Sequence, residues 1–309
     1  MLSRRHFLNT SLGAGLALSA PTAEPAVAQG ARKRLVVDAQ VHLWKAETPD
    51  RPWRPGAVPQ LPEPFTYDQL LPLMNEASVD RVVIVPPSWE GDRNDYALEA
   101  VKKFPDRFGI MGRLPLDKPQ SAALLPKWRD QPGMLGIRAS FNGGLAAWLT
   151  DGTADWFWPA AEKAGVPVMF FTNGNTAEFS RIAERHPQLH LIIDHMGLTT
   201  EIAKSKTIPA AITQSVALAK HPNVSVKLSS APSYSSEPYP YRDMTVHIRR
   251  LFDAYGPRRC HWGTDMTNSF AKATYRERIT HFTEELDFLS EEDKDWVMGR
   301  GILARLDWA

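Results

Sequence analysis

Eight short apolar segments recur along the chain, and each is followed by a stretch with helical spacing. The segments are nearly continuous in β-branched and other apolar residues, as expected of strands buried on both faces. They are Leu35–Val41, Arg81–Pro86, Phe108–Arg113, Met134–Ala139, Pro167–Thr172, Leu189–Asp194, Val224–Ser229 and Cys260–Asp265. Apolar residues three and four positions apart predict amphipathic helices between them, as in Tyr67–Met74, Ala97–Phe104 and Phe179–Ala183.

Strict alternation of strand and helix predicts a parallel sheet with right-handed crossovers. Eight such units favour an α/β fold of the (β/α)8 TIM-barrel type. The alternative is an open doubly wound sheet, which would carry a Gly-rich turn after its first strand, and this chain has none there. Asp92 and Asp155 stand where helix N-caps are expected, and Asp295–Leu306 is predicted to form a closing helix.

Two long loops are predicted at the C-terminal mouth of this distorted barrel. Residues 45–64 form a Pro-rich insert after the first strand, and residues 229–241 form a Tyr- and Pro-rich stretch after the seventh. Long loops in a compact domain are usually functional or disordered. Their aromatic residues favour ordered walls of a pocket, although the loops would equally serve only to cover the end of the barrel.

Polar residues gather at the ends of the predicted strands, where barrel enzymes place their chemistry. In chain order these residues are Gln40, His42, Ser88, Arg113, Arg138, Asn173, Asp194, His195, Lys227, Ser229 and Asp265. A single polar residue at such a position means little, but a ring of them predicts a functional mouth.

Residues 1–28 have the pattern of a twin-arginine signal peptide. Arg4 and Arg5 precede an apolar stretch, and Ala26-Val27-Ala28 is typical of a cleavage site. The remaining residues, 29–309, suit one barrel domain, which we expect in the periplasm. The other interpretation of the segment is a frayed N-terminal tail.

Composition and charge exclude several classes of protein. The formal net charge is +1, and the predicted signal carries the same net charge, so residues 29–309 are near neutral. Nucleic acid is therefore not expected as a partner, and no later stretch is apolar enough to span a membrane. Cys260 is the only cysteine, so no intrachain disulfide forms. A homo-oligomer remains open.

Four motifs carry a resemblance to a known family. Asp38-Ala39-Gln40-Val41-His42-Leu43-Trp44, Asp194-His195-Met196-Gly197, Val226-Lys227-Leu228-Ser229 and Trp262-Gly263-Thr264-Asp265 resemble the amidohydrolase-related family. The branch that they resemble contains 2-pyrone-4,6-dicarboxylate, sugar and sulfomuconolactone lactonases. The resemblance implies a distorted (β/α)8 barrel that hydrolyses a small lactone or ester, often ring-shaped and anionic.

The resemblance also places the metal ligands of the family. His42, His195 and Asp265 match ligand positions, whereas Gln40 stands where the family often has a first His. Zinc prefers imidazole to amide and wants about three protein ligands plus water. A site without metal is therefore favoured over one divalent ion, Zn or Mn, at a weakened site, and Arg138 in place of a Lys argues against a two-metal centre.

A mechanism follows from these positions. Asp265 is predicted to take a proton from water, with His195 orienting Asp265 or holding the water. His42, with Gln40 beside it, is expected to donate to the developing oxyanion. Each of the three also has a purely structural interpretation: a capping Asp and two hydrogen-bonded core histidines.

Substrate binding is predicted for Gln40, Ser88, Arg113, Arg138, Asn173, Lys227 and Tyr234. Arg138 is the first choice for a substrate carboxylate, because a guanidinium matches its geometry. Arg113 and Lys227 are weaker candidates, since a structural ion pair inside the barrel, for example with Asp194, would explain them equally well.

Two other functions stay open. One is a metal-dependent decarboxylase or amide hydrolase on the same fold, which would bind one divalent ion stoichiometrically. The other is a non-catalytic periplasmic binding barrel that lost its chemistry together with the first His of the strand-one motif.

Overall fold

Eight parallel strands pair in chain order from β1 to β8 in the computed structural model, which describes residues 33–173 and 176–309. They are β1 Val37–Val41, β2 Arg81–Ile84, β3 Phe108–Gly112, β4 Met134–Phe141, β5 Val168–Thr172, β6 Leu191–Ile193, β7 Val224–Ser229 and β8 Cys260–Gly263. Each lies within or close to a predicted segment, so the strand prediction is confirmed.

The sheet curls until β8 reaches β1, which forms a nearly closed barrel. The backbone N–H of Asp265 donates to the carbonyl of Gln40 at 2.9 Å, and that of Thr264 donates to Asp38 Oδ1 at 2.8 Å. Gly263 permits this approach, because a Cβ there would stand 3.3 Å from the Gln40 nitrogen. The predicted barrel is confirmed, and the open doubly wound sheet is wrong.

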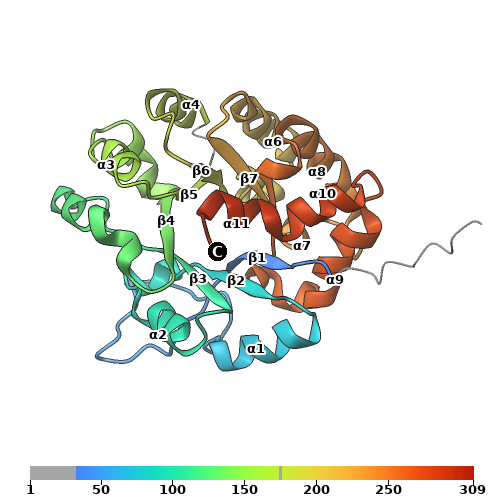
Figure 1. Cartoon of the computed structure of the whole chain (residues 1–309), viewed down its shortest axis with the longest axis horizontal. Coiled ribbons are helices and arrows are strands. Elements are labelled where there is room, and N and C mark those ends of the chain that lie inside the picture. Colours follow the sequence, from blue (N-terminus) through green and yellow to red (C-terminus); the bar gives the residue numbers. More distant parts are fainter. Residues whose placement is uncertain (1–32, 174–175) are drawn as a thin grey trace, which may run out of the picture. The chain divides into compact units, whose positions relative to one another are not determined.

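Helices surround the ring of strands (Figure 1). Their apolar faces pack against the outward side chains of the strands, as the predicted 3.6-residue spacing requires. The helices are α1 Tyr67–Glu76, α2 Asp95–Lys103, α3 Phe157–Lys163, α4 Thr176–Arg185, α5 Thr200–Lys204, α6 Ile208–Ala217, α7 Ala231–Tyr234, α8 Arg242–Tyr255, α9 Tyr275–Thr280, α10 Glu291–Asp295 and α11 Gly301–Leu306.

The amino-terminal end of the barrel is closed by α11, which lies across the ring of strands in Figure 1. Ile302 and Leu306 pack with inward-facing strand residues, among them Val83, Met111 and Met169. This apolar plug occupies the half of the barrel at the amino ends of the strands, so a polar site has room only at their carboxyl ends.

A register shift in β1 affects which of its side chains reach the barrel interior. The pairing of β1 with β2 slips between Asp38 and Val41. Ala39 packs in the apolar interior of the barrel, yet the adjacent Gln40 also reaches the interior side chains Lys227 and His195. Simple alternation along a strand would have placed Ala39 and Gln40 on opposite faces.

The insert after β1 is an ordered wall of the mouth. Arg51 is buried and donates to Glu90 Oε1 at 2.6 Å and to Asp95 Oδ2 at 2.8 Å, which ties the insert to the segment after β2. Residues 54–58 and Gln60 then line the cavity described below. The second predicted loop, 229–241, contains the single turn α7 and also reaches the cavity through Tyr234.

Local predictions at helix ends were less accurate. The N-cap of α2 is Asn94 rather than Asp92, whose carboxylate instead lies 3.4 Å from Arg54, and the N-cap of α3 is Trp156, one residue after Asp155. The predicted closing helix begins earlier, with α10, and continues through a π-helical segment, Trp296–Arg300, into α11.

Residues 34–309 form one compact unit. The predicted signal peptide, residues 1–28, lies outside the described residues. Among the helices that the structure describes, none has the length and hydrophobicity needed to cross a bilayer.

Candidate active site

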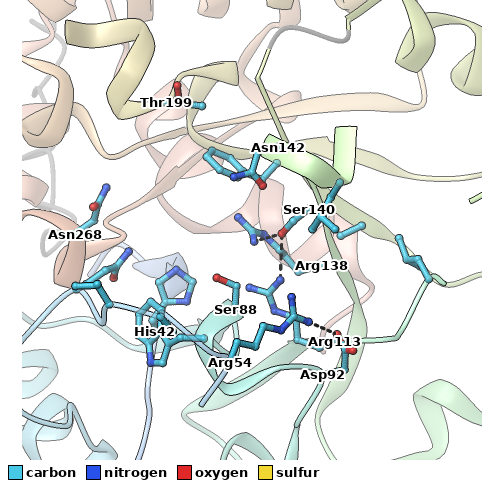
Figure 2. A pocket seen from close by; sticks show the side chains of 18 of the residues that line it. His42, Arg54, Ser88, Asp92, Arg113, Arg138, Ser140, Asn142, Thr199 and Asn268 are labelled. Carbon is cyan, nitrogen blue, oxygen red and sulfur yellow. Dashed lines mark hydrogen bonds and ion pairs between the residues drawn. The ribbon is translucent and has the colours of Figure 1, made fainter. Parts of the chain in front are cut away.

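A cavity of about 960 Å³ opens at the carboxyl ends of the strands. Its walls come from the segments that follow β1, β2, β3, β4, β6, β7 and β8 and from the ends of β4 and β5. Figure 2 shows His42 on one side of the cavity and a group of arginines on the other. Six residues of the predicted polar ring line this cavity, namely His42, Ser88, Arg113, Arg138, His195 and Asp265.

His42 is fixed by a backbone carbonyl. It is buried directly after β1, and its Nδ1 lies 2.6 Å from the oxygen of Val85, at the end of β2. Because a carbonyl only accepts, Nδ1 carries the proton. In the neutral ring, Nε2 is therefore an acceptor, and it faces the cavity floor near Asp265.

His195 has the same tautomer for a different reason. Its Nδ1 lies 2.8 Å from Ser229 Oγ and 3.1 Å from Ser230 Oγ, and Ser230 gives its own proton to Asp265 Oδ2 at 3.0 Å. Ser230 must then accept from Nδ1, which leaves His195 Nε2 as an acceptor. Burial lowers the pKa of His195 to about 4, so the ring is neutral at neutral pH.

Asp265 brings the three predicted groups together. Its Oδ1 lies 3.2 Å from His42 Nε2, and its Oδ2 lies 3.7 Å from His195 Nε2. Burial disfavours the charged carboxylate, but the positive charge that His195 carries once it is protonated at low pH, together with contacts with His42 and Ser230, outweighs it and holds the pKa of Asp265 below its usual value. Oδ1 accepts no hydrogen bond from any side chain or backbone group that the structure describes.

The backbone is strained where these side chains gather. His195, Met196, Ser230 and Asp265 all have positive φ, between 45° and 65°. Left-handed geometry is costly for residues with a side chain, and such strain tends to concentrate at functional sites. Here it turns His195, Ser230 and Asp265 toward one another from three different strands.

A layer of charged residues lies directly beneath the cavity. Gln40 Oε1 accepts from Lys227 Nζ, and Lys227 Nζ lies 2.6 Å from Asp194 Oδ1. Asp194 Oδ2 also accepts from Arg138 Nε at 2.9 Å. Gln40 and Lys227 are fully buried and are not among the described residues that line the cavity, so both act on the site from below rather than on a substrate.

Arg113 and Arg138 form an arginine wall of the cavity. Their two guanidinium groups have different partners. Arg113 Nη1 and Arg138 Nη1 both donate to Ser140 Oγ, at 3.2 and 2.6 Å (Figure 2). Arg138 already has the carboxylate of Asp194, in a structural ion pair of the kind that the sequence suggested for Arg113 and Lys227. Arg113 donates from Nε to the Pro86 carbonyl, and within the described residues no carboxylate lies within ion-pair distance of it.

The other predicted binding residues are placed as follows. Ser88 lines the cavity, and so does Tyr234, although the hydroxyl of Tyr234 already donates to the carbonyl of Leu198 at 3.1 Å. Asn173 is exposed after β5 and lies outside the lining that the described residues form. A binding role for these three residues stays a prediction.

Two residues of the site were missed in the sequence. Ser230 connects His195 to Asp265, and Ser140 connects the two arginines. Period-two alternation from Arg138 along β4 would have pointed to Ser140. No comparable pattern marks Ser230, because its side chain turns inward only through a left-handed backbone.

The predicted metal ligands converge, but the arrangement around them does not fit a divalent cation. Gln40 Nε2 lies 3.3 Å from His42 Nε2 and 3.1 Å from His195 Nε2, so amide N–H groups face both imidazole lone pairs. The oxygen of Gln40, its only atom able to bind a metal, faces the Lys227 ammonium. Among the described residues, no group of three His, Cys, Asp or Glu has the geometry of a metal site.

Two curated relatives are lactone hydrolases by name. The chain is 27% identical over 240 residues to an L-fucono-1,5-lactonase of Burkholderia ambifaria, covering 74% of this chain and 79% of the relative. It is 28% identical over 217 residues to a 4-sulfomuconolactone hydrolase of Hydrogenophaga intermedia, covering 67% of each.

Solved structures agree on the fold. An amidohydrolase from Burkholderia multivorans, crystallised with bound zinc, superposes with a TM-score of 0.74 at 19% identity, over 88% of this chain and 99% of that one. A family model described as amidohydrolase matches residues 37–300, well over half of the chain and all eight strands. The chain therefore belongs to the amidohydrolase family.

Proposed function

We propose that this protein hydrolyses a small lactone, with water activated by Asp265. The observation that carries the proposal is the Asp265 carboxylate itself, which is buried, ionised and without a hydrogen-bond donor at Oδ1, next to two imidazole acceptors at a cavity. The names of the two lactonase relatives support a cyclic ester as the substrate.

The geometry suggests how water is held. Asp265 lines the cavity, and its Oδ1 receives no hydrogen bond from the described residues and lies 3.2 Å from His42 Nε2. A water molecule in the cavity that donates a proton to Oδ1 would direct a lone pair toward a bound carbonyl carbon. His42 does not donate to the oxyanion in this arrangement, because the role expected from the sequence requires a proton on Nε2 that the Val85 carbonyl draws to Nδ1.

The reaction balances without any further reactant. The oxygen of water forms a bond to the lactone carbonyl carbon while its proton moves to Asp265. The tetrahedral intermediate then collapses, the ring C–O bond breaks, and Asp265 returns the proton to the departing ring oxygen. The product is the open-chain hydroxy acid, and the positive arginine wall favours the negative charge that develops on the way.

We propose further that the substrate carries an acidic group. Asp194 is the only carboxylate paired with the two buried cations Lys227 and Arg138 among the described residues. Arg113 has no such partner and lies in the wall of the cavity. Burial and the charge of nearby Arg138 lower the pKa of Arg113 well below its usual value, so an anion in the cavity would relieve an unfavourable charge.

Replacing Arg113 by Met should raise KM for a carboxylated lactone by about 10–100-fold, because a charge-assisted hydrogen bond is worth roughly 1.5–3 kcal/mol. The value of kcat should change little, since Arg113 binds a remote group. Steady-state kinetics on a carboxylated lactone and on an uncharged lactone of equal size measure the effect. Arg54→Met is the matched control, since Arg54 lines the same cavity but has Asp92 as partner. An equal loss on both lactones would refute the acidic group.

A panel of lactones tests the function itself. It should include sugar 1,5-lactones and unsaturated lactones with a carboxylate or sulfonate, followed by acid release and by mass spectrometry of the product. The expected result is the gain of one water by at least one lactone. Release of carbon dioxide from aromatic acids, with no lactone opened, would instead establish the decarboxylase alternative.

A further inference from the structure

Gln40 stands at the centre of the site and contacts both histidines that a metal ion would need as ligands. Its side chain is fully buried, and its Nε2 lies 3.3 Å from His42 Nε2 and 3.1 Å from His195 Nε2. Each of these distances suits one N–H···N hydrogen bond. The two amide protons therefore match the two imidazole lone pairs.

Lys227 fixes which way the amide points. An ammonium only donates, so the Gln40 atom facing Lys227 must be the oxygen, and the NH2 must face the histidines. Lys227 is itself held by Asp194 at 2.6 Å and approaches the sulfur of Met169 at 3.4 Å. The orientation of the amide thus follows from a buried ion pair rather than from packing alone.

Contacts at Nδ1 of both histidines favour the same pairing with the Gln40 amide. The Val85 carbonyl holds the proton of His42 on Nδ1, and Ser230 holds that of His195 on Nδ1. In both rings Nε2 is left as the acceptor. Zinc would need these same lone pairs, so the amide protons and the metal compete for one place.

We propose that Gln40, oriented by Lys227, is a positioning residue that replaces a metal ion in this barrel: it holds both imidazoles in their acceptor form and keeps divalent cations out. This goes beyond a missing ligand, because the amide presents protons to the ligands that remain. The inference concerns the site of the proposed lactone hydrolysis but not its substrate, so metal binding and tautomers test it even if no lactone is turned over.

Zinc affinity separates active exclusion from mere loss of a ligand. If Gln40 were only a poor ligand, Gln40→Ala would bind zinc no better than the wild type. If its amide protons compete with the metal, Gln40→Ala should bind zinc at least about 10-fold tighter, and Gln40→His more than about 100-fold tighter, since loss of one outer-sphere partner alone changes metal affinity 10–100-fold. Titration of the purified protein with Zn²⁺ against a chromophoric chelator measures the dissociation constants.

Lys227→Met should also tighten zinc binding, since it releases the Gln40 oxygen to turn toward the metal. Lys220→Met is its control, because Lys220 is an exposed ammonium with a partner of its own, Glu184. Adding His42→Ala to Gln40→Ala should abolish the gain, which would assign the zinc to this site. Circular dichroism checks that each variant is folded.

Histidine tautomers give a readout that can be taken first on the wild-type protein. Long-range ¹H–¹⁵N spectra of histidine-labelled wild-type protein should show His42 and His195 protonated at Nδ1 and not at Nε2. In Lys227→Met, one of the two rings should take a proton on Nε2 as the amide turns. Stoichiometric zinc in the wild type, Nε2–H in either ring of the wild type, or no gain of affinity in both Gln40→Ala and Lys227→Met would overturn the proposal.

Discussion

Replacing Asp265 by Asn should lower kcat for lactone hydrolysis by about 10²–10⁴-fold, the usual contribution of a general base. The amide has nearly the shape of the carboxylate but cannot take the proton of water. KM should change little, because Asp265 acts on the water rather than on the substrate. Initial rates of acid release at constant pH measure both quantities.

Asp92→Asn provides the matched control for this loss. Asp92 also lines the cavity, but its carboxylate pairs with Arg54 and contacts neither histidine. Its removal should leave kcat close to that of the wild type. A folded Asp265→Asn variant that retains wild-type kcat would remove Asp265 from the mechanism.

Asp194→Ala should lower the free energy of unfolding by about 3–5 kcal/mol, the usual cost of breaking a buried ion pair from one side. Asp194 is fully buried and pairs with both Lys227 and Arg138. Those two charges hold the pKa of the Asp194 carboxyl below its usual value, against the opposing effect of burial. Without Asp194, Lys227 and Arg138 have no carboxylate within ion-pair distance among the described residues. Urea denaturation followed by circular dichroism measures the change.

An exposed ion pair provides the control for the unfolding measurement on Asp194→Ala. Asp253 lies 3.6 Å from Arg249 on the surface of α8, and both side chains are more than half exposed. Asp253→Ala should cost about 0.3–0.5 kcal/mol, as for other helix-surface pairs. If Asp194→Ala cost no more than Asp253→Ala, the charged layer beneath the cavity would have no structural role.

Much of the fold followed from the sequence because hydrophobic periodicity governs it. Strands buried on both faces gave continuous apolar segments, and each of the eight was placed correctly. The N-caps near Asp92 and Asp155 were misplaced by one or two residues, since a polar residue near a helix start has other partners available, here Arg54 for Asp92. The register shift in β1 leaves no mark in the pattern.

The ring of polar residues was also predictable, because the carboxyl ends of barrel strands meet on one face. Which cation binds a substrate was not predictable. Arg138, Arg113 and Lys227 look alike in the sequence, and only the structure assigns Asp194 to two of them and leaves Arg113 without a carboxylate within the described residues. The choice therefore moves from Arg138 to Arg113.

The directions of the hydrogen bonds in the site were the hardest feature to predict from the sequence. The substitution at Gln40 indicated a weakened metal site, but the direction of its amide depends on Lys227, which is 187 residues away. The acceptor form of His42 likewise depends on the Val85 carbonyl of a neighbouring strand. Neither contact has a local signal, so a donor role for His42 was the natural expectation.

The central claim is that Asp265, beside the imidazoles of His42 and His195, activates water without a metal. Its most direct test measures lactone hydrolysis and metal content on the same samples, from chelator-stripped protein to protein supplied with zinc. We expect the rate per enzyme molecule to be independent of bound metal and to stay at its full value in the stripped sample. A rate that vanishes on stripping and returns in proportion to bound zinc would contradict the account.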